Sequence, residues 1–166
     1  MPVTAIDLFC GAGGLTRGLL DAGLQVSAGI DFDDNCRYAY QHNNQAEFLH
    51  AEIEDIHRET LMQYYPENDI KVLVGCAPCQ PFSSHTNKYK KDPNAPRDKR
   101  WFLLNHFSRL IEEVRPDVVS MENVPQLSKQ KIFEEFVIKL QTLNYNVSWS
   151  VVYCPNYGIP QRRNRL

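Results

Sequence analysis

The sequence has 166 residues, of which 43% are hydrophobic and 23% charged, with 18 basic residues against 20 acidic ones. This composition excludes an intrinsically disordered or collagen-like chain, and no apolar run approaches the ~20 residues of a membrane-spanning helix. A chain of this length buries roughly 70% of its unfolded surface, so we expect one soluble domain that needs no disulfide or metal for stability. The five cysteines are an odd number and favour free thiols in a cytosolic protein.

Strands and helices are predicted to alternate along the chain. Short apolar, β-branched runs predict strands at residues 3–9, 26–30, 47–49, 70–75, 118–121 and 147–153. Apolar residues at helical spacing predict helices at 15–22, 33–43, 101–114 and 131–143. This alternation is typical of an α/β fold with a mostly parallel sheet, helices on both faces and ligands at the carboxyl ends of the strands.

Charge is distributed unevenly along the chain. Residues 47–69 carry seven acidic residues against one basic residue, a net of −6. Residues 85–100 carry six Lys or Arg against two Asp, and the last six residues add Arg162, Arg163 and Arg165. We expect a polyanion to meet these two basic regions. The length of 85–100 and its scarcity of apolar residues are typical of a lid or binding loop.

A glycine-rich turn follows the first predicted strand, with the sequence Phe9-Cys10-Gly11-Ala12-Gly13-Gly14. Its glycines allow a tight turn and a close approach of a ligand to the backbone, although they also serve plain helix–strand packing. Asp31 ends the next strand, where a carboxylate can accept hydrogen bonds from ribose hydroxyls. Thr16 replaces the third glycine of the dinucleotide motif, which favours a nucleoside cofactor without a pyrophosphate, such as S-adenosylmethionine. Glu52 follows the third strand and is either an adenine ligand or a solvated acid.

A cysteine lies in a proline-stiffened loop after the strand at 70–75, in Pro78-Cys79-Gln80-Pro81-Phe82-Ser83. Two chemistries compete there: Cys76 and Cys79 have the spacing of a redox dithiol, whereas Cys79 alone is a candidate covalent nucleophile. Inert buried thiols are the structural alternative. No second pair of ligands has metal-binding spacing, so no metal site is predicted.

Two further polar groups are predicted at the same edge of the sheet. Glu122 ends the strand at 118–121 and is a candidate general acid. Arg163 and Arg165 lie at alternate positions, so both project to one face of an extended segment and can bind a phosphate or a carbonyl oxygen there.

The ordered motifs resemble those of the C5-type cytosine DNA methyltransferases, from about Thr4 to the last residue. The shared motifs are residues 7–14, Asp31, residues 78–83, residues 122–124 and residues 161–165. The resemblance implies a Rossmann-like S-adenosylmethionine-dependent methyltransferase fold, incomplete at the C-terminus. It implies one catalytic, cofactor-binding domain over 1–166, with a long mobile active-site loop at about 83–100. The implied S-adenosylmethionine pocket is lined by Phe9, Gly11, Gly13, Asp31, Phe32, Glu52, Ile53 and Leu103, with Glu52 standing where Asp is usual.

The resemblance also implies a reaction and a partner. A methyl group would pass from S-adenosylmethionine to C5 of a cytosine flipped out of double-stranded DNA. Cys79 would add to C6, and Glu122 would protonate or hydrogen-bond N3 and the exocyclic amine. Arg165 would hold the O2 edge, and Arg163 would support the pocket or a phosphate. No membrane is implied, and the location would be the cytoplasm of a bacterium or its phage, or the nucleus in a eukaryote.

The family continues beyond the Gln-x-Arg-x-Arg motif with a target-recognition region and later motifs, whereas this chain stops at Leu166. We therefore expect a truncated catalytic core, or one part of a split enzyme whose complementing subunit carries the target-recognition region. Little or no methylation is expected of the isolated chain. Three alternatives stay open: an RNA (tRNA) cytosine-C5 methyltransferase of the same family, a thiol redox module using Cys76 and Cys79, and a non-catalytic regulatory homologue.

Overall fold

The computed structural model describes residues 1–78 and 102–166. The predicted nucleophile Cys79 and the predicted loop at 83–100 lie outside the described residues. The chain divides into two compact units, which are described separately below. The first comprises Met1–Cys76 and Arg109–Met121, and the second comprises Ala77–Ser108 and Glu122–Leu166.

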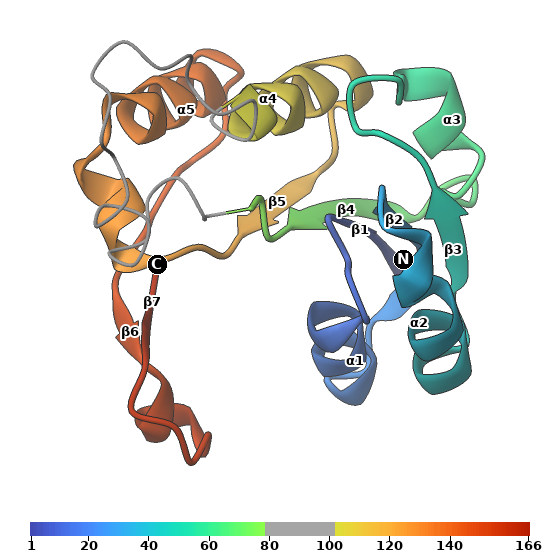
Figure 1. Cartoon of the computed structure of the whole chain (residues 1–166). Helices are drawn as coiled ribbons and strands as arrows, with labels where there is room; N and C mark the ends of the chain where they lie inside the picture. The colour runs from blue at the N-terminus through green and yellow to red at the C-terminus, as the bar shows by residue number, and fades with distance from the viewer. Residues whose placement is uncertain (79–101) are drawn as a thin grey trace, which may run out of the picture. The chain divides into compact units, whose positions relative to one another are not determined.

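The first unit contains a five-stranded sheet in the order β3-β2-β1-β4-β5, and every neighbouring pair in it is parallel. Its strands are β1 (Val3–Leu8), β2 (Gln25–Asp31), β3 (Glu47–His50), β4 (Ile70–Gly75) and β5 (Val118–Met121). Helices α1 (Gly14–Asp21) and α2 (Arg37–Asn44) lie on one side of the sheet, and α3 (Arg58–Met62) lies on the other (Figure 1). The predicted parallel α/β architecture is confirmed.

The core of this unit is centred on β1, the middle strand of the sheet. Ala5, Ile6 and Leu8 of β1 are fully buried, as is Leu73 of β4. A strand covered on both faces reads as a nearly continuous apolar run, which is why β1 and β4 are recognisable in the sequence. The only charged side chain inside β1 is Asp7, which is also fully buried.

The second unit is built around α5 (Lys131–Thr142), which follows the 3₁₀ turn η5 (Pro125–Lys129). Helix α5 buries Phe133, Phe136 and Leu140 on one face. The ring of Phe136 lies 5.8 Å from that of Phe107 in α4 (Leu103–Val114), a helix that starts in this unit and ends in the first. The unit closes with a short antiparallel pair, β6 (Val152–Tyr153) and β7 (Asn164–Arg165), joined through the 3₁₀ turn η6 (Cys154–Tyr157).

Two predicted elements are wrong in their extent. The strand predicted at 147–153 forms only at β6, because no partner strand lies beside residues 146–151 within the described part of the chain. The helix predicted at 33–43 begins with a separate 3₁₀ turn, η1 (Asp34–Cys36), because the side chain of Asp33 accepts a hydrogen bond from the Asn35 N–H and caps that turn. Helix α3 has no counterpart among the predicted elements.

Candidate functional site

The glycine-rich turn lies at the carboxyl end of β1 and leads directly into α1. Phe9, Gly11 and Gly13 all have positive φ angles, of 60°, 50° and 89°. A Cβ on Gly13 would lie 2.1 Å from Nδ2 of Asn44, so this position needs glycine for its space as well as its conformation. A Cβ on Gly11 would meet no atom of residues 1–78 or 102–166 within 4 Å, so these residues leave open space above the backbone of the turn.

Asp31 ends β2 and joins two backbone segments. Its Oδ2 accepts a hydrogen bond of 2.8 Å from the Gly11 N–H, and its Oδ1 accepts one of 3.0 Å from the Asp33 N–H. Each carboxylate oxygen retains a second lone pair for a ligand. Asp31 therefore holds the glycine-rich turn in place, a role that the sequence did not reveal, and can still accept a ligand hydroxyl.

The remaining predicted cofactor residues of this unit lie near the same strand ends. Phe32 follows Asp31 and is 60% exposed, and its carbonyl oxygen lies 2.8 Å from Nε2 of His50. The Ala51 N–H donates to the Asp31 carbonyl oxygen at 3.1 Å, which places the segment carrying Glu52 and Ile53 beside the end of β2. Glu52 is exposed, and Ile53 is buried. Leu103, the eighth predicted cofactor residue, starts α4 in the other unit.

Asp7 is the first residue of the shared motif at 7–14, and the sequence assigned it no role of its own. Oγ1 of Thr16 donates to Asp7 Oδ2 at 2.7 Å and lies 3.0 Å from the Tyr40 hydroxyl. Oδ1 of Asp7 has no hydrogen-bond partner among the described residues. Burial raises the pKa of Asp7 to about 7, and the hydrogen bonds from Thr16 offset only part of that rise. A charged residue in the middle of an apolar strand was the signal that could have found it.

The raised pKa of Asp7 predicts a pH-dependent stability. Between about pH 4 and pH 7 the folded chain keeps a proton on Asp7 that the unfolded chain has lost, so stability falls as pH rises through this window. At about 1.4 kcal/mol per pKa unit, the free energy of unfolding should fall by up to about 4 kcal/mol relative to Asp7→Asn, whose amide cannot ionise. Urea unfolding at several pH values measures this difference, with the exposed Glu67→Gln as control. Equal pH slopes for the wild type and Asp7→Asn would contradict it.

Burial also raises the pKa of Cys10, and the carboxylates of Asp7 and Asp31 add to the rise. A thiol that resists ionisation is a poor nucleophile. Cys10 is buried in the hydrophobic core of this unit, where we expect it to stay a protonated thiol.

The second unit brings Glu122 and Arg165 together. The Asn123 N–H donates to the Leu166 carbonyl oxygen at 2.9 Å, and the Leu166 N–H donates back to the Asn123 carbonyl oxygen at 2.8 Å. In this antiparallel exchange Glu122 and Arg165 lie diagonally across the two segments on the same face, and Nε of Arg165 lies 2.5 Å from Oε1 of Glu122. The Arg165 side chain is 16% exposed and that of Glu122 is 41% exposed. The glutamate is therefore accessible to a ligand while the guanidinium beneath it is largely covered.

Asn123 ties this pair to the segment that leads into Cys79. Its Nδ2 donates to the Ala77 carbonyl oxygen at 2.9 Å, and its Oδ1 accepts from the Val124 N–H at 2.9 Å. Asn123 is buried, so an unpaired amide there would be costly, and both of its polar ends are used. Asn123 belongs to the shared motif at residues 122–124, but the sequence alone assigned it no role.

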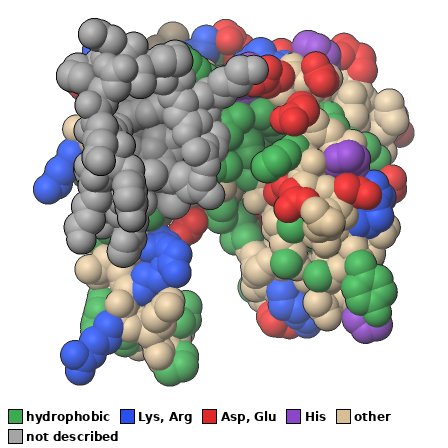
Figure 2. All heavy atoms as spheres, viewed as in Figure 1, with side chains coloured by type: hydrophobic (Ala, Val, Ile, Leu, Met, Phe, Trp, Pro, Cys, Tyr) green, Lys and Arg blue, Asp and Glu red, His purple; other side chains and the backbone are tan. Residues whose placement is uncertain are grey.

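Arg163 is not brought to Glu122 in the same way. Its side chain is exposed, and its carbonyl oxygen accepts the Cys154 N–H at 2.8 Å across the β6–β7 hairpin. Arg162, Arg163 and Arg165 all lie on this hairpin, and basic side chains gather there (Figure 2). Arg163 thus belongs to an exposed basic surface, while Arg165 belongs to the covered ion pair.

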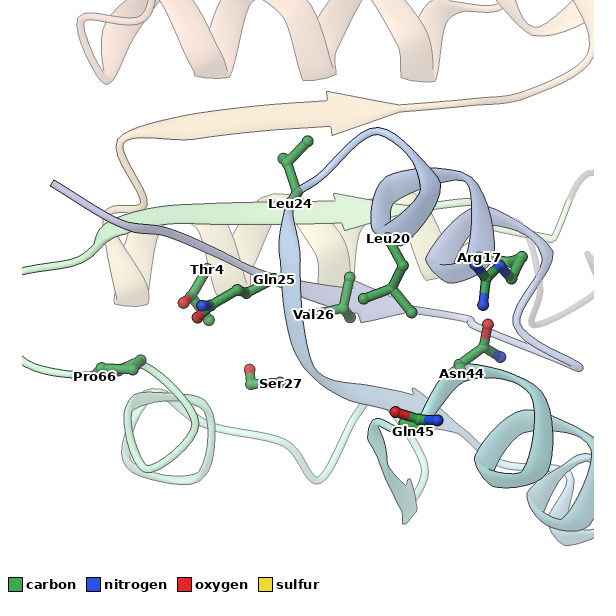
Figure 3. A pocket seen from close by; sticks show the side chains of 10 residues that line it. All are labelled: Thr4, Arg17, Leu20, Leu24, Gln25, Val26, Ser27, Asn44, Gln45 and Pro66. Atoms are coloured by element: carbon green, nitrogen blue, oxygen red, sulfur yellow. The ribbon is translucent and has the colours of Figure 1, made fainter.

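An open pocket of about 480 Å³ lies in the first unit (Figure 3). Thr4 and Gln25, which line it, stand at the amino ends of β1 and β2, whereas the predicted ligand edge is the carboxyl end. Within the described ranges, no cluster of three or more His, Cys, Asp or Glu side chains could hold a metal ion. No helix in the same ranges is long and apolar enough to cross a membrane.

Comparison with known proteins identifies the family. Residues 3–166 match the family model of the C-5 cytosine-specific DNA methylases. The chain belongs to this family. Members of this family use S-adenosylmethionine as the methyl donor. Among the relatives, the type II methylase M.HgiDII of Herpetosiphon aurantiacus is 49% identical to the chain over 164 residues. The type II methyltransferase M.XorII of Xanthomonas oryzae is 31% identical over 169 residues.

Solved structures confirm the Rossmann-like methyltransferase fold of this methylase-family chain. A putative DNA modification methyltransferase from an Escherichia coli prophage superposes with a TM-score of 0.78 at 25% identity, covering 98% of this chain and 44% of that one. Schizosaccharomyces pombe Dnmt2 also gives 0.78, at 20% identity, covering 99% of this chain and 48% of that one, and shows the fold alone. Both of these relatives match 97% of this chain. The chain spans only 45% of the length of M.HgiDII and 38% of the length of M.XorII.

Proposed function

We propose that this chain is the catalytic and cofactor-binding part of an enzyme that methylates C5 of cytosine in double-stranded DNA. The observation that carries the proposal is the Glu122–Arg165 pair, which Asn123 joins to the Ala77 backbone two residues before Cys79. A DNA substrate and bacterial relatives such as M.HgiDII favour the bacterial cytoplasm as its location.

The proposed chemistry begins with the cytosine ring, whose C5 is a weak nucleophile. The Cys79 thiolate adds to C6 of a cytosine flipped out of the duplex, which makes C5 electron-rich. Glu122 donates a proton or hydrogen bond at N3, so that negative charge does not build up on the ring. S-adenosylmethionine, when bound, would supply the methyl group that C5 takes and would leave as the neutral thioether S-adenosylhomocysteine. Loss of the C5 proton to a base then returns the electron pair to the ring and expels the Cys79 thiolate.

Arg165 has two tasks in this proposal. Its ion pair orients the Glu122 carboxyl toward one position, and its remaining guanidinium N–H groups can donate to the O2 edge of cytosine. The exposed Arg163 suits a DNA phosphate better than the base itself, because its side chain lies on the basic hairpin surface.

The cofactor half of the proposal rests on the first unit. The open space above Gly11, the Asp31 carboxylate and the exposed Phe32 ring surround the carboxyl ends of β1 and β2. These groups fit the methionine part, the ribose and the adenine of S-adenosylmethionine, in that order. Glu52 and Ile53 extend the adenine side of the site.

Asp31→Ala is expected to weaken S-adenosylmethionine binding by about 10- to 100-fold, because it removes charge-assisted hydrogen bonds to the ribose and to the Gly11 N–H. Isothermal titration of the cofactor into the wild type and the variant measures the loss. Asp34→Ala is the matched control, since Asp34 is an exposed carboxylate on the neighbouring η1 turn that pairs with Arg37. Equal affinities of the wild type and Asp31→Ala would contradict the assignment of the ribose site.

We also propose that a further polypeptide region, in the same protein or in a complementing subunit, carries target recognition. Residues 146–151 are β-prone but form no strand in the described part of the chain, and Trp149 and Val151 within this segment are 55% and 48% exposed. A strand from the further region would cover this segment. Methylation of duplex DNA with a defined sequence preference by purified residues 1–166 alone would contradict the proposal.

A further inference from the structure

The side chain of Arg109 in α4 binds backbone carbonyl groups of the loop between β3 and α3. Its Nη2 donates to the carbonyl oxygens of Ile53 and Ile56 at 3.0 and 2.9 Å, and lies 3.4 Å from that of Glu54. Nη1 donates to Oε1 of Glu113 at 2.7 Å. One guanidinium therefore serves three carbonyl groups of a single loop as well as a carboxylate.

The carbonyl groups of Ile53 and Ile56 are partly buried where Arg109 reaches them. The side chains of Ile53 and Ile56 are buried, and the loop between them forms no strand or helix that would pair its backbone. Carbonyl oxygens in such a place are costly to leave without a donor. A planar group with five N–H donors suits several carbonyls at once, which an ammonium group does less well.

Glu113 contacts the far end of the loop, at Arg58. Oε2 of Glu113 accepts the Arg58 N–H at 3.1 Å at the start of α3, and Nη1 of Arg58 donates to the Glu113 carbonyl oxygen at 2.9 Å. Burial favours the neutral form of Glu113, but hydrogen bonding and charge from Arg109 outweigh it and hold the pKa of this carboxyl below its usual value. The Arg109–Glu113 pair is therefore ionised, and it ties α4 to both ends of the loop.

The near end of the loop joins the proposed cofactor site. The Ala51 N–H donates to the Asp31 carbonyl oxygen, and Arg109 holds the carbonyl oxygen of Ile53, so only Glu52 stands between these two fixed points. We propose that Arg109 is a positioning residue for the nucleoside half of the cofactor, which it fixes through the backbone of residues 53–56. This inference rests on the proposed function.

Arg109→Met tests the inference, because it keeps the length of the aliphatic stem and removes every N–H donor. Isothermal titration gives the affinity for S-adenosylmethionine, and ligand-observed NMR gives that for adenosine, at a temperature where every variant is folded by circular dichroism. We expect Arg109→Met to weaken both ligands by the same factor, about tenfold, and Arg109→Lys to recover part of the loss. Arg17→Met is the matched control, since Arg17 also pairs with an acid four residues along its helix and is exposed.

Each outcome decides something. Unchanged affinity of Arg109→Met for adenosine overturns the inference, whether or not its melting temperature falls. Equal losses in Arg17→Met and Arg109→Met overturn it as well, because the effect would then not depend on the loop. Absence of S-adenosylmethionine and adenosine binding in the folded wild type overturns the proposed function itself, and the inference with it.

Discussion

Cys79→Ser is expected to lower cytosine methylation by about four orders of magnitude or more, the scale seen when an enzyme loses its nucleophile. A serine hydroxyl is not ionised near neutral pH, so it cannot replace a thiolate in adding to C6 of the ring. Transfer of a tritiated methyl group to duplex DNA measures the rate, with the chain supplied together with the region that completes target recognition. Duplex DNA containing 5-fluorocytosine should trap a covalent adduct with the wild type and none with Cys79→Ser.

Cys76→Ser is the control for this experiment. Cys76 is half-buried, and its backbone N–H donates to the Leu8 carbonyl oxygen at 3.3 Å, a bond that serine keeps. A methyltransferase therefore tolerates the change, whereas a dithiol redox module built on Cys76 and Cys79 would lose its function. Trapping of an adduct by Cys79→Ser, or loss of methylation in Cys76→Ser, would contradict the covalent role of Cys79.

Glu122→Gln is expected to lower kcat by about 10²- to 10⁴-fold, the range for removal of a general acid. Glutamine keeps the shape of the side chain and can donate a hydrogen bond, but it cannot transfer a proton to N3. The change also leaves the largely covered Arg165 without its counter-charge. Steady-state methylation with saturating cofactor measures kcat, while the affinity for S-adenosylmethionine should stay unchanged because Asp31 and the glycine-rich turn supply it.

Glu135→Gln provides a control of the same chemistry at an exposed site. Glu135 pairs with Lys131 on the outer face of α5, 3.3 Å away, and such surface pairs contribute little to stability. Its removal should leave both kcat and cofactor affinity at wild-type values. A wild-type kcat for Glu122→Gln would refute its assignment as the general acid.

The alternating architecture could be predicted because its signals are local. Each strand of the sheet is a short apolar run, and parallel strands need both faces buried, so β1 and β4 stand out from their surroundings. The strand predicted at 147–153 was wrong in its extent because that prediction also rested on a local signal alone. Its residues favour an extended chain, but a strand also needs a partner, and propensity does not say whether one lies beside it.

The residue types at parts of the site could be predicted from the sequence, but their hydrogen bonds and distances could not. The glycines and Asp31 were identifiable from the turn chemistry and from strand ends, yet the bond from the Gly11 N–H to Asp31 depends on how β1 and β2 lie together. Asn123 and Arg109 could not be assigned roles, because what each one holds is a backbone carbonyl distant in the sequence. Carbonyl groups are the same in every residue, so no pattern of side chains marks the ones that need a donor.

The sequence by itself determined the α/β order of the chain and its membership of a methylase family, together with the residue types at each strand end. Hydrophobic periodicity and turn chemistry act over a few residues, so they can be read without a structure. Only the tertiary structure decided that Arg165, and not Arg163, reaches Glu122, and that Asp7 is buried with a raised pKa. Both depend on distances and on burial, which arise only when segments far apart along the chain pack against each other.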